Sequence, residues 1–177
     1  RVNGLDTPWG PDDLKAAEDV LMKVRPYIRM IHSSQYIDSL ANGDLCISLG
    51  WSGDVLQARD RATEAGNDVV VKYLIPREGA VMFFDMLAIP ADAKHVKNAH
   101  LFIDYLLRPD VAAKNTNFVN FANSNAASFS QVNEEIRNDP GIYPAEAIKP
   151  KLVPDLAESS AFTRLLTRSW TRFKTGQ

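Results

Sequence analysis

Short apolar runs that alternate with helical patterns are the feature that most limits how this chain can fold. Apolar residues recur at helical spacing over residues 11–24, 35–41 and 55–65, whereas residues 27–31 and 45–50 form short apolar runs between them. Strands that alternate with helices in this way are typical of a mainly parallel sheet covered by helices. We therefore predict an α/β fold.

Two further apolar runs lie in the middle of the chain. Residues 69–75 are rich in β-branched side chains and stop at Pro76, and residues 81–89 stop at Pro90, so both runs are predicted strands. Elsewhere we predict helices at 95–107, at 131–138, at 159–174 and a short one starting at 108–109, a loop at 118–125 and an irregular connection at 144–154.

Composition and charge exclude several classes of partner. Of the 177 residues, 45% are hydrophobic and 24% are charged, which is ordinary for a globular protein. The 20 basic and 22 acidic residues give a net charge of −2 without a basic block, so we expect no nucleic acid and no polybasic membrane patch. The longest apolar run, 81–90, is interrupted by Asp85 and is too short to span a bilayer, so we expect no membrane insertion.

Cysteine and histidine give little support to redox or metal chemistry. Cys46 is the single cysteine, and its place in a predicted strand favours a small buried side chain over a nucleophile. His32, His95 and His100 have no metal-ligand spacing and are predicted to be surface or capping residues. We expect neither a metal nor a cofactor.

The turn at residues 50–54 is the first candidate for a ligand site. A predicted strand enters it and a predicted helix leaves it, so Trp51 and Asp54 lie where open α/β sheets bind ligands. The turn has too few glycines for a phosphate loop, and its carboxylate favours a cationic or polar ligand. The plainer alternative is that Trp51 is a core residue and Asp54 a helix N-cap.

Ser52, in the same turn, raises the alternative of a hydrolase. A serine between a strand and a helix is also the setting of the G-x-S-x-G nucleophile elbow. The fifth position of that motif is Asp54 here instead of glycine, so the match fails.

Asp85 is a second carboxylate that needs an explanation, because it lies inside an apolar run and a buried charge is costly unless it is paired. Either one of the chain's own arginines pairs with it, or its partner is a ligand cation. In a strand, Phe83 would lie on the same face as Asp85. An aromatic ring beside each carboxylate, Trp51 with Asp54 and Phe83 with Asp85, is suited to binding ammonium groups.

Several runs of residues carry a resemblance to a known family. They are His32-Ser33-Ser34-Gln35-Tyr36, Ala41-Asn42-Gly43-Asp44, Gly50-Trp51-Ser52-Gly53-Asp54, Pro76-Arg77-Glu78-Gly79-Ala80, Phe83-Phe84-Asp85, Leu106-Leu107-Arg108-Pro109-Asp110-Val111 and Asn138-Asp139-Pro140-Gly141-Ile142-Tyr143-Pro144. With these runs the chain resembles the C-terminal half or so of bacterial periplasmic polyamine-binding proteins, the putrescine/spermidine receptors of ABC importers, and the resemblance covers nearly all 177 residues.

The resemblance implies a periplasmic-binding-protein type II fold, an α/β fold of two lobes with a ligand cleft between them. It implies lobe segments at 1–70 and 126–177 for the C-terminal lobe and at 71–125 for part of the N-terminal lobe. The chain starts at Arg1 without a methionine or a signal sequence, and the family precursor is considerably longer, so we expect a fragment that lacks much of the N-terminal lobe. The residues that match ligand-contacting positions of the family are Trp51, Asp54, Phe83, Asp85 and Ser33.

Phe121 departs from the family pattern. It lies in the predicted loop at 118–125 and is either a packing anchor or the wall of a cleft. Putrescine-binding relatives carry a tyrosine at the aligned position. The departure removes a hydroxyl and leaves the preferred polyamine open.

The function implied is that of a periplasmic solute-binding protein without enzymatic activity. Such a protein captures a polyamine, putrescine or spermidine, and delivers it to an ABC permease, and here it would need the missing N-terminal half of the same protein. The rival hypotheses are a serine hydrolase that uses Ser52 and an interaction lobe that binds no ligand.

Overall fold

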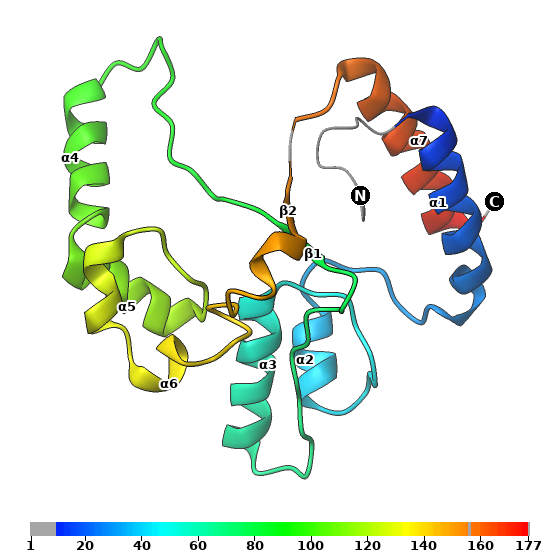
Figure 1. Ribbon diagram of the computed structural model, residues 1–177, viewed down its shortest axis with the longest axis horizontal. Helices are drawn as coiled ribbons and strands as arrows, with labels where there is room; N and C mark the ends of the chain where they lie inside the picture. Colours follow the sequence, from blue (N-terminus) through cyan, green and yellow to red (C-terminus); the bar gives the residue numbers. More distant parts are fainter. Residues whose placement is uncertain (1–9, 156, 177) are drawn as a thin grey trace. The chain divides into compact units, whose positions relative to one another are not determined.

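The computed structural model describes residues 10–155 and 157–176, and most of its regular structure is helical (Figure 1). The strands are β1 (Ala80–Met82) and β2 (Leu152–Pro154). The helices are α1 (Pro11–Val24), α2 (Tyr36–Ala41), α3 (Ser52–Ala65), α4 (Val96–Leu106), α5 (Pro109–Val119), α6 (Glu134–Arg137) and α7 (Ser160–Thr175), with 3-10 turns η1 (Arg25–Tyr27), η2 (Ala126–Gln131) and η3 (Lys149–Lys151).

Contacts divide the chain into two compact units, which are described separately. Unit 1 combines Arg1–Ser33, Glu78–Met82 and Lys151–Gln177, and unit 2 combines Ser34–Arg77 and Phe83–Pro150. These units are clusters of contacts within this chain. The lobe boundaries implied by the resemblance concern a larger protein, so they stay a prediction.

In unit 1, β1 and β2 form a small parallel sheet. Ala80 lies opposite Leu152 and Met82 opposite Pro154, and the backbone amide of Asp155 donates a 2.9 Å hydrogen bond to the Met82 carbonyl. Gly79 makes the pairing feasible, because it has φ +117° and a Cβ there would lie 2.2 Å from the Lys151 carbonyl oxygen. Parallel pairing agrees with the type of sheet that the sequence predicts.

The predicted extent of the strands is wrong. The strand predicted at 81–89 is reduced to β1, which covers residues 80–82. The runs 27–31, 45–50 and 69–75 are not strands in the part of the chain that the structure describes. Apolar side chains in these runs face solvent, with Ile47 90% and Leu49 95% exposed. Residues that favour β-structure predict a strand, but a strand forms only where a neighbouring strand supplies its backbone hydrogen bonds.

The prediction that Cys46 is buried is also wrong. Cys46 is exposed, because the run 45–50 does not pair with a neighbouring strand.

The helices follow the prediction more closely, because their hydrogen bonds are local. α3 starts at Ser52 instead of residue 55, and α5 extends to Val119, beyond the short helix predicted from residue 108. The helix predicted at 131–138 is reduced to α6, with η2 before it.

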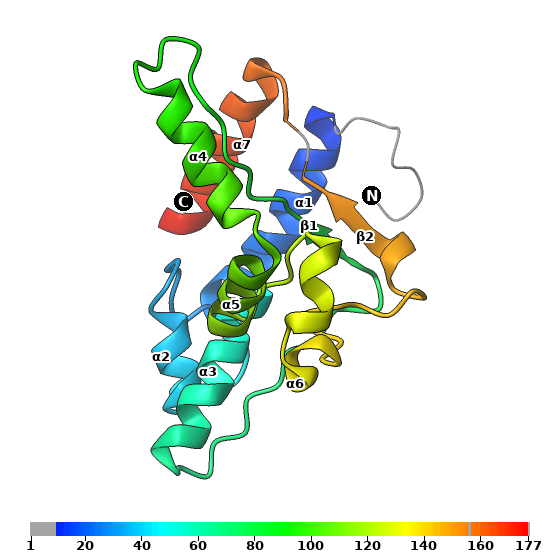
Figure 2. The ribbon, with the colours of Figure 1, turned by 90° about the vertical axis from the view of Figure 1, so that its left-hand side faces the viewer.

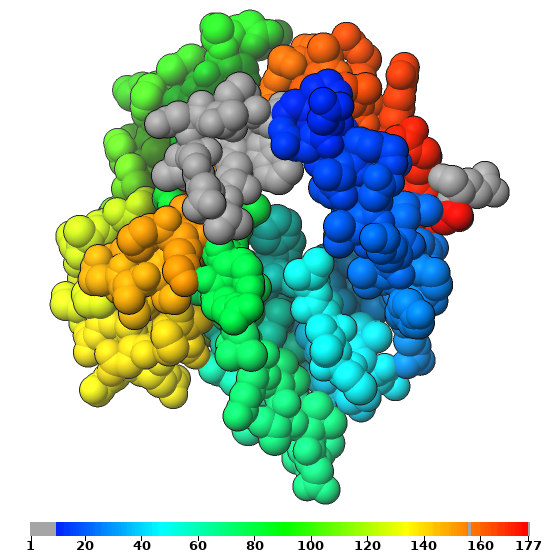
Figure 3. Space-filling view, turned by 45° about the vertical axis from the view of Figure 1, so that its right-hand side comes forward, coloured from blue at the N-terminus to red at the C-terminus, as the bar shows by residue number. Residues whose placement is uncertain are grey.

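α1 and α7 pack side by side in unit 1 (Figures 1 and 3). Glu18 is buried between them and accepts hydrogen bonds of 3.1 and 2.6 Å from Arg172. Arg25 donates bonds of 2.8 and 2.9 Å to the carbonyls of Phe173 and Lys174, which satisfies the free carbonyls at the end of α7. The Ser159 side chain caps the other end of α7.

Unit 2 has its core where α3, α5 and α6 meet, and α2 packs along α3 (Figure 2). α3 starts after an extended residue, Trp51, and ends at Gly66 in the left-handed conformation. One face of α3 is buried through Val55, Leu56, Ala58 and Ala62. The core cluster consists of Leu56, Ala113, Val132, Ile136 and Ile142, with Tyr73 and Tyr143 packed against it.

We predict that Glu18→Gln lowers the melting temperature at neutral pH by a few degrees. The hydrogen bond from Arg172, with a smaller contribution from Ser169, lowers the pKa of Glu18 below its ordinary value of 4.5. A carboxyl whose pKa is lowered by folding stabilises the fold above its unfolded pKa, and that stability is lost as pH falls through the folded pKa. The difference between the variant and the parent should therefore disappear in acid.

Thermal melts at neutral pH and at a series of values down to about pH 2 check this prediction, because the difference disappears only below the lowered folded pKa. Asp19→Asn is the matched control, because Asp19 lies on the same helix in an exposed pair with Lys15, and such pairs contribute little. Equal effects of the two substitutions would contradict the role of Glu18.

Candidate ligand-binding site

The turn at 50–54 positions two predicted site residues of unit 2 on the first turn of α3. Trp51 is the N-cap residue, with an extended backbone, and Asp54 lies within the first helical turn. The alternative that Asp54 is the N-cap is therefore wrong. Its carboxylate instead accepts a 2.6 Å hydrogen bond from the Tyr36 hydroxyl, and an acidic group in a first turn interacts favourably with the helix dipole.

Tyr36 connects this turn to α2. Its side chain is 5% exposed, and its hydroxyl also accepts a 3.1 Å hydrogen bond from the backbone amide of Trp51. Burial, and then the hydrogen bond to Asp54, raise the pKa of Tyr36 to about 12. The hydroxyl is therefore protonated at neutral pH.

Three aromatic rings form a row next to this turn. The ring centroids of Trp51 and Phe83 are 4.6 Å apart with an interplanar angle of 67°, and those of Phe83 and Phe121 are 6.4 Å apart at 72°. Both are edge-to-face arrangements, which aromatic pairs favour. Trp51 is 50% exposed, so it is not a core residue as the plainer alternative held.

Phe121 packs directly on the backbone of α3. A Cβ at Gly53 would lie 2.3 Å from the Phe121 ring, a distance that side chains do not tolerate without movement. Phe121 is therefore a packing anchor for the turn. The contact also brings the last ring of the row to the helix that carries Asp54.

Asp85 is exposed and forms no hydrogen bond or ion pair with the residues of unit 2 that the structure describes. The hypothesis that an internal arginine of this unit pairs with it is therefore wrong here. The argument that Phe83 and Asp85 share a strand face does not apply, because the strand ends at Met82. Ser33 is exposed and lies at the end of a unit 1 segment, so the places of Asp85 and Ser33 in the site stay predictions.

Sequence reasoning missed Tyr36 and Gly53 as determinants of the site. The only sequence signal for Tyr36 is its spacing of four residues from Leu40, which indicates that both side chains face the core from α2. That spacing does not reveal a hydroxyl partner 18 residues away. The close approach at Gly53 also involves a distant residue, so local patterns cannot show it.

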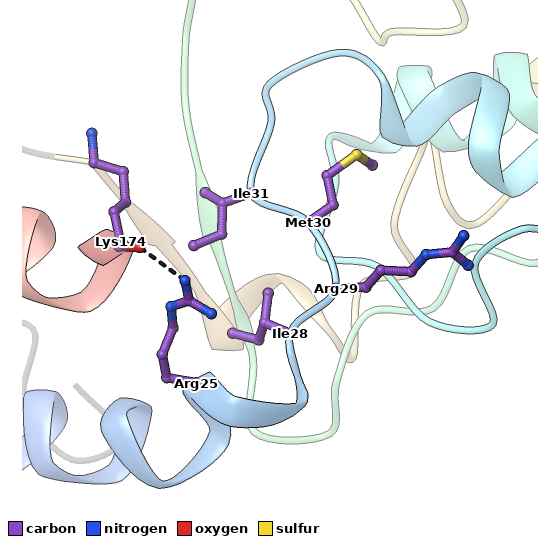
Figure 4. A pocket seen from close by; sticks show the side chains of 6 residues that line it. All are labelled: Arg25, Ile28, Arg29, Met30, Ile31 and Lys174. Atoms are coloured by element: carbon purple, nitrogen blue, oxygen red, sulfur yellow. Dashed lines mark hydrogen bonds between the residues drawn. The ribbon is translucent and has the colours of Figure 1, made fainter. Parts of the chain in front are cut away.

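A hollow of about 270 Å³ in unit 1 has the wrong charge for a cationic ligand. Arg25, Arg29 and Lys174 line it together with Ile28, Met30 and Ile31, and Figure 4 shows Arg25 bonded to the Lys174 carbonyl while Arg29 points away from both. Basic residues would repel an ammonium group. This hollow is therefore not the site that the two carboxylates predict.

Within residues 10–155 and 157–176, no group of three or more His, Cys, Asp or Glu side chains is arranged to hold a metal ion. None of the helices in these ranges is long and apolar enough to cross a membrane. His32, His95 and His100 are exposed, as the sequence predicts.

The model of the bacterial extracellular solute-binding protein family matches residues 2–144. The chain belongs to this family. It is a family of binding proteins, in agreement with the prediction that the chain is not an enzyme. Membership also confirms the resemblance drawn from the sequence.

Two relatives of this solute-binding protein are particularly similar to it. The putrescine-binding periplasmic protein SpuD of Pseudomonas aeruginosa is 51% identical over 169 residues, which cover 94% of this chain and 46% of the relative. The putrescine-binding periplasmic protein PotF of Escherichia coli is 50% identical over 161 residues, which cover 91% and 44%. The chain thus spans about half the length of the curated relatives it matches.

A solved structure supports the fold. The spermidine/putrescine ABC transporter substrate-binding protein PotD of Streptococcus pneumoniae matches with a TM-score of 0.73 at 23% identity, covering 96% of this chain and 50% of the other. The solute-binding protein fold is thereby confirmed in coarse form, as a mostly helical chain with a small parallel sheet.

We predict that Gly53→Ala destabilises unit 2 by about 1–3 kcal/mol, because the added methyl group overpacks the contact with Phe121. Without that contact, alanine would stabilise a helix relative to glycine. Denaturant unfolding of the variant measures the change. The double variant Gly53→Ala/Phe121→Leu should recover part of the loss, and a Gly53→Ala protein as stable as the parent would disprove the close packing.

Proposed function

We propose that this chain is part of a periplasmic solute-binding protein that captures a polyamine and delivers it to an ABC permease. The main support comes from two putrescine-binding relatives that are 51% and 50% identical to this chain. Each alignment covers more than nine tenths of the chain. Putrescine is therefore the first candidate ligand. Spermidine is the second, because spermidine/putrescine-binding proteins are similar at 33% identity.

The chemistry of unit 2 suits a linear diamine. Such a ligand has a cationic group at each end and methylene groups between them. The row of Trp51, Phe83 and Phe121 offers apolar ring surface for the methylenes and ring faces for a cation. Asp54, beside this row, offers a carboxylate for one ammonium group.

Asp85 is proposed to bind the other ammonium group, and Ser33 to add a polar contact. Asp85 is suited to this role because it is exposed and makes no ion pair within the described part of unit 2. Ser33 is proposed from the family pattern alone. Phe121 in place of a tyrosine offers no hydroxyl to a ligand, so selectivity between polyamines would depend on ring contacts at this position.

The proposed protein has two lobes, with a cleft between them that closes on the polyamine. The lobe segments are those given by the family pattern, 1–70, 71–125 and 126–177, and the missing N-terminal half is a required partner. Hydrolysis by Ser52 has no support in the geometry, because Ser52 has no hydrogen bond to a base among the described residues.

Titration of polyamines into a chimera tests the function. In this chimera the N-terminal part of SpuD precedes the present chain, which restores the length of the relatives. Calorimetry with putrescine, cadaverine, spermidine and spermine should show binding of putrescine, whereas the chain alone should bind weakly because groups from both lobes are needed. If the chimera binds none of these polyamines, the proposal is refuted, and the rival hypothesis of an interaction lobe that binds no ligand is favoured.

Trp51→Ala in the chimera should weaken putrescine binding about 3- to 30-fold, through loss of apolar and cation–π contact. Trp170→Ala is the matched control, because Trp170 is 47% exposed, close to the 50% of Trp51, and lies in unit 1. The control should leave affinity unchanged. A similar loss in both variants would remove Trp51 from the site.

Asp85→Asn in the chimera should weaken putrescine binding roughly 10- to 150-fold, because a charge-assisted hydrogen bond is lost. The melting temperature without ligand should not fall, since Asp85 makes no ion pair with described residues of unit 2. Asp92→Asn, at another exposed aspartate, is the control for the change in net charge. Unchanged affinity in Asp85→Asn would exclude Asp85 from the site.

A further inference from the structure

One buried oxygen atom holds two residues of the proposed site. Tyr36 Oη accepts the 3.1 Å hydrogen bond from the Trp51 amide and lies 2.6 Å from Asp54 Oδ2. Trp51 carries the exposed ring of the site and Asp54 its carboxylate. The positions of both therefore depend on a residue that belongs to a different helix, α2.

The direction of the two hydrogen bonds is fixed by chemistry. A backbone amide can only donate, so the Tyr36 oxygen is the acceptor in the bond from Trp51. The hydroxyl proton then points to Asp54, whose carboxylate accepts the hydrogen bond. Because the hydroxyl is protonated at neutral pH, it can donate this hydrogen bond there.

Close packing keeps the Tyr36 ring in place. Leu40 and Ala41 of α2 are buried with it. A Cβ at Gly50 would lie 2.5 Å from the Tyr36 ring and 3.0 Å from Val55 Cγ2, so the chain entering the turn lies directly on the ring. The hydroxyl cannot swing away without disturbing the turn itself.

Asp54 has one oxygen that is open to a ligand. Oδ2 accepts the hydrogen bond from Tyr36, whereas Oδ1 accepts no hydrogen bond from the described residues of unit 2. The side chain is half-buried, so it keeps access to solvent. A carboxylate held by one oxygen loses less rotamer freedom when its other oxygen binds a ligand, which strengthens binding.

Building on the proposed function, we propose that Tyr36 is a positioning residue of the polyamine site. Its hydroxyl orients Asp54 so that Oδ1 receives a ligand ammonium group, and it holds the Trp51 backbone at the start of α3. Tyr36 itself does not touch the ligand.

A double-mutant cycle in the chimera separates positioning from a merely structural role. The variants are Tyr36→Phe, Asp54→Asn and the two combined, each titrated with putrescine by calorimetry. We expect Tyr36→Phe to weaken binding roughly tenfold, as the loss of one hydrogen bond to a charged group implies. In the Asp54→Asn background the same change should weaken binding clearly less, because the carboxylate that Tyr36 orients is gone and only the contribution through the Trp51 amide remains.

Tyr143→Phe is the matched control. Tyr143 lies in the same unit and is partly buried, and its ring packs on Phe129, but its hydroxyl forms no hydrogen bond with the described residues. This variant should bind putrescine like the parent. Melting temperatures of all variants show which of them are folded.

Several results would overturn the proposal. Equal losses from Tyr36→Phe in both backgrounds, or failure of Tyr36→Phe to fold, would give the hydroxyl a structural role only. An unchanged affinity of Tyr36→Phe in a chimera that binds putrescine would refute positioning while the proposed function stands. If the parent chimera binds none of the four polyamines, the function fails and the positioning role with it.

Discussion

The hydrogen-bonded contact between α2 and the first turn of α3 is the constraint on which the site in unit 2 depends. Tyr36 is buried, and its hydroxyl is saturated by a backbone donor on one side and a carboxylate on the other. A buried hydroxyl without such partners would cost free energy. The glycines at 50 and 53 follow from this arrangement, because the Tyr36 and Phe121 rings occupy the space that side chains there would need.

The aromatic row extends this constraint to segments far apart in the sequence. Trp51 starts α3, Phe83 follows β1, and Phe121 follows α5, yet their rings meet edge to face. Phe121 is fixed by its contact with Gly53, and Phe83 contacts both of the other rings. Unit 2 thus brings apolar ring surface from three segments beside the start of α3, which carries the Asp54 carboxylate.

The apolar runs that do not pair are the other main feature of the chain. Ile47, Leu49, Val70 and Leu74 are largely exposed, although burial of such a side chain stabilises a protein by about 1.5–3 kcal/mol. Exposed apolar surface on this scale is typical of an interface. These runs are not strands in the described part of the chain, so the α/β character that the sequence predicts depends on more than local sequence.

The sequence by itself determined most of the helices and the family, and it predicted the residue types of the site. Pro11, Ser159 and the spacing of apolar residues mark the boundaries of α1 and α7, because the hydrogen bonds of a helix join residues close in sequence. Tertiary structure alone decided which apolar runs became strands, that Cys46 and Asp85 are exposed, and that Asp54 is bound by Tyr36 instead of capping a helix. Each of these depends on partners distant in the chain, and a linear pattern of residue types carries no information about which distant groups meet.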